Sequence, residues 1–347
     1  MRFFKQLFIF IIIVLLSFCS CDFNIFENNN TSYKTGFVMG SVFEQSIDYI
    51  DLYDDYIFQE ISSDLTALEN LISEKIDQSD IYKINNSSEL NQIYSPKTIP
   101  YLTFAKELNQ KTNGYYDITS GQLVNLWGFG SSNARVPSQS EIDSAISSIS
   151  SEHIKINGDY AYLDNQNCSL DFGSMGKGIA CDIVLQKYAL YENKIKWAVF
   201  SLGGSSIAVF GEKETPFKIS IRNPYGTQNN SVGYLSIKSG TVSTSGNYEK
   251  VLETEDKTYH HILNPFTGYS SDNELVSVTV LHPSGMVSDA LSTACFLIGI
   301  EKSLPLLSEY NAEAIFINNK NQILLTGNLN ESFTLKDPSG KFSVLNI

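Results

Sequence analysis

Residues 170–182 read LDFGSMGKGIACD, and residues 288–293 read SDALST. The first stretch places an apolar run and a carboxylate before three glycines, and then continues with small residues typical of a helix start. Glycine amides at a helix N-terminus can cradle an anion. In the second stretch, Asp289 and Thr293 are four residues apart and share one helix face. Together the two stretches predict an anion-binding turn that faces oxygen ligands for Mg²⁺.

Each stretch also has a purely structural explanation. The glycine pattern fits neither a Walker A loop nor the Rossmann fingerprint, and glycine clusters often form tight turns. Ser288 or Asp289 could simply cap a helix. The pair His260 and His261 could supply a neutral imidazole as general base, or could lie in solvent at a strand end. Trp127 could stack on a flat ring or close a turn in the core.

The composition is that of a globular protein. The 347 residues are 42% hydrophobic and 18% charged, and the net charge is −14. Nucleic-acid binding needs a basic surface, so we expect no nucleic-acid partner. Cys168, Cys181 and Cys295 lack the spacing of a disulfide framework or a zinc site, and we expect them to be buried.

The N-terminal segment is predicted to be a targeting signal. Arg2 and Lys5 precede an apolar run over 7–16, which is short for a membrane span. Ser20 and Cys21 resemble a lipoprotein cleavage site. We therefore expect a signal peptide over 1–20, and a lipidated Cys21 with a flexible tether over 21–34. The alternative is plain secretion. The expected location is the outer-facing or periplasmic side of a cell membrane, with the protein held there by lipid.

Hydrophobic periodicity predicts one α+β domain over 35–347, because helices and strands mix without a regular βαβ alternation. Helices are expected over 56–76, 98–112, a short segment ending at 149, 179–191 and 290–300. Strands are expected over 35–46, 153–156, 161–163, 198–202, within 217–242, and over 275–281, 313–317 and 322–326.

The order of several short motifs resembles the ApbE family of FAD:protein FMN transferases, from about residue 36 to residue 300. The matching motifs are Met39-Gly40-Ser41, Tyr116 to Gly121 with Asn125 to Gly130, Leu170 to Gly178, Ser201 to Gly204, Thr244 to Gly246, His260 to Gly268, and Asp289 to Thr293. The resemblance implies a single large domain of the T-fold-like ApbE type, often carried by exported lipoproteins.

The resemblance also implies an activity. FMN would be transferred from FAD to a Thr or Ser hydroxyl of a target protein, with Mg²⁺ required and AMP released. The implied acceptors are electron-transfer membrane proteins that carry an Asp-x-x-Ser/Thr-Gly/Ala type of motif. FAD is thus the expected substrate and Mg²⁺ the expected cofactor.

The resemblance assigns roles to particular residues. His261 is the implied base, and Asp289 is implied in both catalysis and metal binding. The other implied metal ligands are the Gly176 carbonyl, Thr293 and, as a possible addition, Ser292. The implied FAD contacts are Met39, Asn85, Asp117, Ile118, Thr119, Gly173, Lys177, Ile179 and Ile262.

Four positions depart from the family pattern. Gly176 stands where many members have alanine, and Ser41 replaces the usual threonine. Ser205 and Asn264 stand where the family usually has aspartates, which removes two carboxylates.

Two alternatives keep the fold and change the activity. One is an FAD pyrophosphatase that releases FMN and AMP, and the other is a non-enzymatic FAD-binding lipoprotein. A penicillin-binding enzyme is disfavoured, because Ser174 and Lys177 satisfy S-x-x-K but Phe266 replaces the lysine of the third motif.

Overall fold

The computed structural model describes residues 30–51, 55–227 and 229–347. The predicted signal peptide and the predicted lipidation of Cys21 lie outside these residues. In the described part of the chain, no helix combines the length and the apolar character that crossing a bilayer requires.

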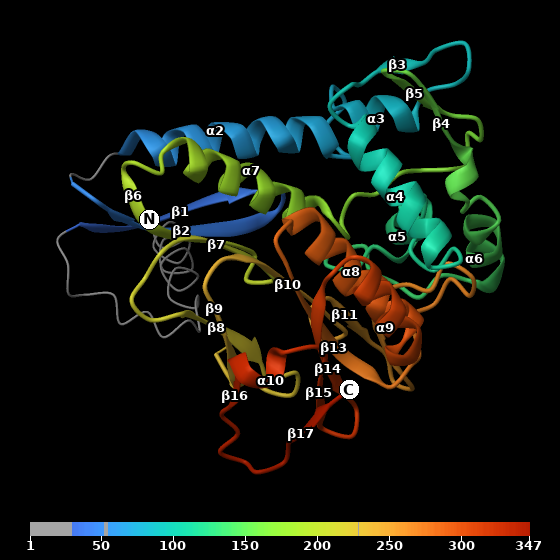
Figure 1. Cartoon of the computed structure of the whole chain (residues 1–347). Helices are drawn as coiled ribbons and strands as arrows, with labels where there is room; N and C mark the ends of the chain where they lie inside the picture. Colours follow the sequence, from blue (N-terminus) through green and yellow to red (C-terminus); the bar gives the residue numbers. More distant parts are fainter. Residues whose placement is uncertain (1–29, 52–54, 228) are drawn as a thin grey trace, which may run out of the picture.

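A nine-stranded sheet forms the centre of the molecule (Figure 1). All neighbouring strands are antiparallel except the last pair, β15 and β17, which is parallel. In spatial order the strands are β1 (Thr31–Val38), β2 (Ser41–Tyr49), β6 (Ile195–Leu202), β7 (Ser206–Gly211), β10 (Gly240–Gly246), β13 (Leu275–His282), β14 (Glu313–Asn318), β15 (Gln322–Leu325) and β17 (Ser343–Asn346).

Three smaller sheets accompany it. The first consists of β16 (Phe333–Leu335), β9 (Ser231–Ile237) and β8 (Phe217–Arg222). The second consists of β3 (Ile93–Tyr94), β5 (Tyr160–Leu163) and β4 (Ile154–Asn157). The third is the pair β11 (Val251–Glu253) and β12 (Thr258–His260). The helices are α2 (Asp55–Ile72), α3 (Asp80–Asn85), α4 (Ile99–Lys111), α5 (Gly121–Trp127), α6 (Gln139–Ile146), α7 (Gly176–Leu190), α8 (Gly285–Ile298), α9 (Ile300–Glu309) and α10 (Leu329–Ser332), with a 3₁₀ turn at Ser151–His153.

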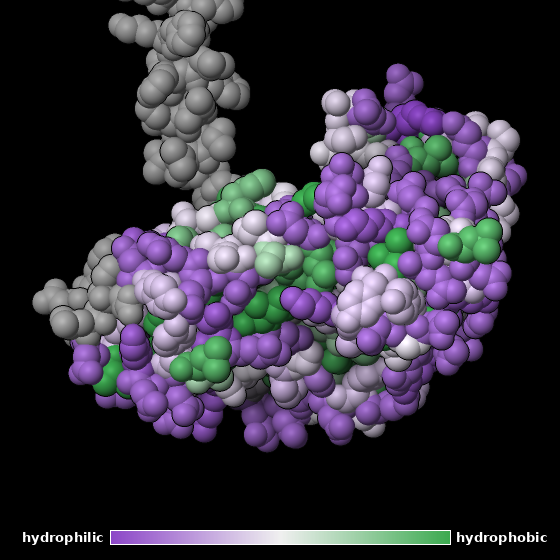
Figure 2. All heavy atoms as spheres, turned by 90° about the horizontal axis from the view of Figure 1, so that it is seen from above, coloured by the Kyte–Doolittle hydropathy of each residue, from purple (hydrophilic) through white to green (hydrophobic). Residues whose placement is uncertain are grey.

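The two faces of the central sheet build two cores. Because side chains alternate along a strand, Ala198 and Phe200 of β6 join the core under α2, α7 and α8, whereas Trp197 and Val199 join the core under β8 and β9. In Figure 1, α2 and α7 therefore lie above the sheet, and β8, β9 and β16 lie below it. The view from above in Figure 2 is mostly hydrophilic, with hydrophobic residues in small separate groups.

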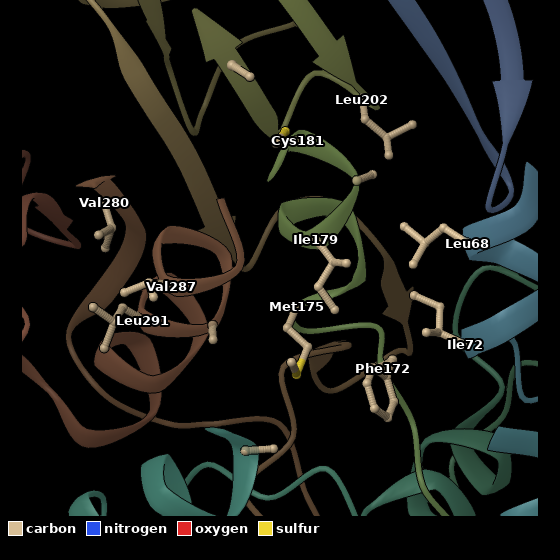
Figure 3. Close-up of a cluster of buried hydrophobic side chains, with 14 of the residues drawn as sticks. Leu68, Ile72, Phe172, Met175, Ile179, Cys181, Leu202, Val280, Val287 and Leu291 are labelled. Carbon is tan, nitrogen blue, oxygen red and sulfur yellow. The ribbon is translucent and has the colours of Figure 1, made fainter. Parts of the chain in front are cut away.

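The helical layer is held together by apolar faces at helical spacing. Ile57, Ile61, Leu65, Leu68 and Ile72 are the buried residues of α2. Figure 3 shows Met175 and Ile179, at the start of α7, on the side of Leu68 and Ile72. Val287 and Leu291 of α8 lie near Val280 of β13 in the same view.

Helices α7 and α8 touch backbone to backbone where they cross. A Cβ atom on Gly178 would lie 2.1 Å from the carbonyl oxygen of Gly285, and one on Gly285 would lie 2.3 Å from the carbonyl oxygen of Gly178. Real Cβ atoms do not approach so closely, so both positions require glycine for lack of space. The crossing brings the glycine turn and the SDALST segment, 111 residues apart at Gly178 and Asp289, into direct contact.

The α+β prediction is confirmed, and several predicted boundaries are wrong. Residues 31–34, assigned to the tether, form the first half of β1, and the single strand predicted over 35–46 is a hairpin that turns at Met39 and Gly40. Helix α7 begins at Gly176 rather than at 179, and α8 begins at Gly285 rather than at 290. Cys168, Cys181 and Cys295 are buried and free, as predicted.

Candidate active site

Helices α7 and α8 cap each other at the crossing. The backbone N–H of Gly178, in the first turn of α7, donates to Asp289 Oδ2 of α8 at 2.8 Å. In return, Asp182 of α7 accepts from the N–H groups of Gly285 and Met286 at 2.5 and 2.9 Å. The first N–H groups of a helix have no partner within it, and a carboxylate satisfies both their hydrogen bonds and the helix dipole. Each helix thus fixes the start of the other.

Asp289 is buried, with 4% of its surface exposed. Burial raises the pKa of its carboxyl, while the charge of Lys177 and the N–H of Gly178 act in the opposite direction. The Asp289 Oδ1 atom lies 3.4 Å from the Ser206 hydroxyl. Lys177 itself donates through Nζ to the hydroxyl of Ser205, the residue found here in place of the family aspartate. A buried carboxylate beside one cation is an arrangement suited to binding a further cation or a polar ligand.

Hydroxyl groups line the interface between β10 and α8. Ser245 Oγ lies 2.7 Å from Ser292 Oγ and 3.0 Å from Thr293 Oγ1. Ser292 also donates to the carbonyl oxygen of Asp289 at 2.8 Å. Ser245 therefore connects the hydroxyls of two predicted metal ligands, Ser292 and Thr293, while the carboxylate of Asp289 on the same helix contacts Gly178 and Ser206. Further along the same two elements lie Thr241, Ser243 and Ser288, whose hydroxyls meet at 2.9 and 3.1 Å.

The two histidines have opposite environments. His260 is buried, and its Nε2 lies 3.0 Å from the carbonyl oxygen of Ser271 while its Nδ1 accepts from the N–H of Ile262 at 3.3 Å. His261 is held through its backbone N–H, which donates to the carbonyl oxygen of Lys250 at 3.2 Å, but its Nδ1 is buried without a hydrogen-bond partner in the described structure. The alternative that both histidines lie in solvent is wrong.

The ring of His261 is neutral at physiological pH. Burial, together with the nearby charges of Lys250 and Lys177, lowers the pKa of His261 to about 3. In the tautomer that carries its proton on Nε2, the Nδ1 atom is an acceptor. His261 can therefore take a proton from a group that enters the site, which is the property its predicted role requires.

The tip of the β1–β2 hairpin reaches the same site. Met39 has a positive φ of 52° and donates its N–H to Glu69 Oε1 at 2.9 Å. A Cβ on Gly176 would lie 2.9 Å from the terminal methyl of Met39, so these two predicted site residues are in contact. Because a methionine end is flexible, an alanine in place of Gly176 would need only a small shift of the Met39 side chain.

Other predicted FAD contacts already have partners inside the protein. Asn85 binds the backbone of Leu170 on both sides, with its Nδ2 at 3.1 Å from the carbonyl oxygen and its Oδ1 at 2.7 Å from the N–H. Asp117 Oδ1 accepts from the N–H and the hydroxyl of Thr119, and its Oδ2 accepts from Asn109. These side chains therefore hold the segment that leads into the glycine turn. The carbonyl oxygen of Ile118 adds a further contact, since it accepts the N–H of Asp171 at 2.8 Å.

The remaining predicted contacts divide by exposure. The side chains of Ile118, Thr119, Ile179 and Ile262 are buried, so only their backbone or a small movement could bring them to a ligand. Gly173 is exposed, and its N–H donates to Asp171 Oδ1 at 2.6 Å. Because the N–H groups of Gly173 and Gly178 already donate to Asp171 and Asp289, the ammonium group of Lys177 is the main feature that the turn offers to an anion.

Two open alternatives are now decided. Trp127 is fully buried and donates through Nε1 to the carbonyl oxygen of Gly268 at 2.8 Å, so it is a core residue. Ser174 donates to the hydroxyl of Tyr116 at 2.9 Å. Lys177 bonds to Ser205 instead of Ser174, so the pair has no nucleophile-and-base contact of the penicillin-binding type.

The oxygen donors fit a hard divalent cation. Over residues 30–51, 55–227 and 229–347, no group of three or more His, Cys, Asp or Glu side chains could hold a metal. The donors gathered at Asp289 are one carboxylate and neighbouring hydroxyls. Such a set excludes a zinc-type site, and it matches Mg²⁺, which keeps several waters and shares the phosphates of its substrate.

Sequence reasoning missed the residues that connect the site. Asp182 and Ser206 each contact a predicted site residue or its helix, and Ser245, which lies in one of the matching motifs, was given no metal-binding role. For Ser245 a signal existed, since hydroxyls at 241, 243 and 245 alternate along one strand face. The pairing of Asp182 with the start of α8 spans 103 residues and leaves no local pattern.

Solved structures that include a flavin transferase have the same fold as this chain. The ApbE protein of Thermotoga maritima superposes with a TM-score of 0.75 at 25% identity, over 88% of this chain and 97% of that chain. The flavin transferase ApbE from Vibrio cholerae gives a TM-score of 0.73 at 25% identity, over 89% of this chain and 97% of that chain.

The chain belongs to the ApbE family, whose model matches residues 39–316. Curated relatives named FAD:protein FMN transferase include that of Escherichia coli K12, 30% identical over 77% of this chain and 78% of that protein. The relative from Buchnera aphidicola is 30% identical over 85% of this chain and 89% of that protein. The relative from Treponema pallidum is 29% identical over 60% of this chain and 62% of that protein.

Proposed function

We propose that this protein transfers FMN from FAD to a Ser or Thr hydroxyl of an acceptor protein and releases AMP. Three features carry the proposal: the contact of Asp289 with the first turn of α7, the hydroxyls of Ser292 and Thr293 further along α8, and the buried ring nitrogen of His261 that has no partner in the described structure. The names of the curated relatives, which match most of the chain, support the same activity.

Mg²⁺ would be held by Asp289, Thr293 and the Gly176 carbonyl, with Ser292 as a further ligand. When bound, it would neutralise charge on the pyrophosphate of FAD. Lys177 adds a positive charge on the same side, because its effect lowers the pKa of both Asp289 and His261. The N–H of Gly173 already donates to Asp171, so the ammonium group of Lys177 would be the main contact that this turn offers to the phosphates.

His261 would act as the general base. Its Nδ1 takes the proton of the acceptor hydroxyl, and the hydroxyl oxygen forms a bond to the phosphorus of the FMN half of FAD. The bond from that phosphorus to the bridging oxygen breaks, and AMP leaves with that oxygen. The lowered pKa keeps the His261 ring unprotonated at neutral pH, so that its Nδ1 can accept a proton.

The test is to incubate the purified protein with FAD and Mg²⁺, with and without a peptide that carries an Asp-x-x-Thr-Gly motif. Mass spectrometry of peptide and nucleotides then distinguishes the outcomes. A peptide that gains FMN while AMP appears supports the transferase. FMN and AMP without modified peptide would mean that water is the acceptor, and FAD that stays intact would leave a binding protein.

We also propose that the protein is exported and held at a membrane by a lipid on Cys21. The basis is the sequence of the first 21 residues alone, with its basic start, apolar run and Ser20-Cys21 junction. Labelling cells with a fatty-acid probe should mark the parent protein and leave Cys21→Ala unlabelled. Equal labelling of both proteins would reject the assignment.

A further inference from the structure

The outer face of the sheet β8–β9–β16 differs in charge from the rest of the molecule. The whole chain has 24 Lys and Arg against 38 Asp and Glu. No acidic residue occurs in β8, β9 or β16, whereas β8 carries Lys218 and Arg222, and Lys238 and Lys336 directly follow β9 and β16. The apolar side chains of these strands pack inward, so Lys218, Lys238 and Lys336 are exposed.

Two of these lysines flank one tyrosine. The ammonium groups of Lys218 and Lys336 lie 4.8 and 5.4 Å from the ring centre of Tyr234. In the described structure, neither lysine forms an ion pair with a carboxylate. The nearest acidic residue in sequence, Asp337, accepts instead from the N–H groups of Ser339 and Phe342. The positive charge of this face is therefore available to a partner.

The face also borders the active site. At the end of β8, Arg222 Nη1 donates to Glu249 Oε1 at 2.7 Å, and its guanidinium carbon lies 4.7 Å from the ring centre of Tyr248. Tyr248 and Glu249 belong to the segment 245–250. That segment begins at the Ser245 hydroxyl beside Thr293 and ends at the carbonyl oxygen that holds His261.

We propose that this basic face, defined by Lys218, Arg222, Tyr234 and Lys336, docks an acidic surface of the acceptor protein. The inference rests on the proposed function and specifies its second substrate. Opposite charge on two partners accelerates their encounter and sets their orientation. Arg222, at the end of β8, contacts the segment 245–250, so an acceptor docked at that end of the face would lie next to the segment that holds the His261 backbone. An anionic bilayer is disfavoured, because the remainder of the chain is more acidic than the whole and would be repelled.

The test uses two synthetic acceptors with one Asp-x-x-Thr-Gly core, joined by a flexible linker to six glutamates or to six glutamines. FMN transfer gives KM, and fluorescence anisotropy gives binding without chemistry. We expect KM and Kd to be roughly tenfold lower for the glutamate peptide at low salt, and the preference to fade as salt screens the charges. The double variant Lys218→Glu/Lys336→Glu should abolish the preference and leave FAD binding unchanged.

A matched control separates this effect from a general change of charge. Lys97→Glu/Lys196→Glu alters the net charge equally at two exposed lysines away from the face and should keep the preference. Equal affinity of the parent protein for both peptides overturns the docking face. Lysine-dependent binding to vesicles of anionic lipid, without a peptide preference, would overturn it in favour of a membrane. If the glutamate peptide binds through the two lysines but neither peptide receives FMN, the docking face stands and the proposed transferase activity falls.

Discussion

The two halves of the candidate site differ in how completely their polar groups are satisfied. On the α7–α8 side, Asp182 and Asp289 each accept backbone N–H groups of the opposite helix. On the other side, His261 has a buried ring nitrogen with no partner in the described structure, although the adjacent His260 has partners on both ring nitrogens. An unsatisfied buried polar atom is costly and uncommon, so one that persists calls for an explanation. We interpret the helix crossing as the preformed frame and His261 as the place where a substrate completes the hydrogen bonding.

The largest effect is expected at Asp289. Asp289→Asn keeps an oxygen that can accept the Gly178 N–H, but it loses the charge that would hold Mg²⁺. We expect turnover to fall by about 10³-fold or more while the fold is retained. Turnover is measured as AMP release with Mg²⁺, and folding by circular dichroism. Asp182→Asn is the control, since it makes the same change at the opposite cap. Parental turnover by Asp289→Asn would place the metal elsewhere.

The two neighbouring histidines should separate catalysis from stability. His261→Gln removes the base, and a loss of about 10²- to 10³-fold in turnover is expected with little change in the melting temperature. His260→Ala removes a ring bonded to Ser271 and should destabilise the fold by about 2 kcal/mol, with turnover of the folded protein reduced less. Thermal melts and turnover of both variants test this. Equal losses of stability in His261→Gln and His260→Ala would contradict the prediction that His260 stabilises the fold and His261 serves catalysis.

The crossing itself is tested by a pair of glycines. At Gly178 an added methyl group meets the Gly285 carbonyl at 2.1 Å, and the backbone cannot yield without moving a helix. Gly178→Ala should cost about 3 kcal/mol of stability. At Gly176 the same methyl meets the flexible end of Met39 at 2.9 Å, so Gly176→Ala should cost less than about 1 kcal/mol. Urea denaturation measures both. A loss of less than about 1 kcal/mol in Gly178→Ala would mean that the two helices can move apart without cost.

The reciprocal cap on α8 should contribute less. Asp182→Ala leaves the N–H groups of Gly285 and Met286 without their carboxylate, although Ser284 still caps the helix by accepting from Val287. We expect a loss of about 1–2 kcal/mol in urea denaturation. Asp182→Asn should recover part of it, because one amide oxygen can still accept. No loss in either variant would show that Ser284 alone suffices.

The sequence was sufficient for the family and for the ligand types, and insufficient for the contacts between them. The glycine turn, the SDALST segment and the histidine pair were each recognisable, and their order indicated the ApbE family. The helix starts were placed too late, because Ser288 and Asp289 resemble caps. In the structure Ser284 caps α8, and Ser288 is buried where its hydroxyl meets those of β10. A local pattern cannot reveal that hydroxyls inside a helix are matched by a strand more than 40 residues away.

The environment of His261 was equally inaccessible from the sequence. The sequence gives no sign of which of two adjacent histidines has hydrogen-bond partners, and alternation along a strand predicts only that their side chains point to opposite faces. The ring of His260 has Ser271 and Ile262 as its partners, whereas Lys250 accepts only the backbone N–H of His261. The functional difference between the two histidines therefore arises from packing.

The smallest effect is expected from the loss of Lys250, a positively charged neighbour of His261. The pKa of His261 is about 3 in the folded protein and about 6.5 in an unfolded chain. Between these values the unfolded state binds a proton that the folded state does not, so this residue makes stability fall as the pH drops from about 6.5 toward 3. Lys250→Gln removes a positive neighbour and raises the pKa of His261, which should make the decline with acid shallower and move the acid limb of the activity profile to higher pH. Urea denaturation at several pH values measures the first effect, with Lys97→Gln as a control of equal charge change. If Lys250→Gln follows the parent at every pH, the lysine does not act on the ring, and the isolation of His261 is due to burial alone.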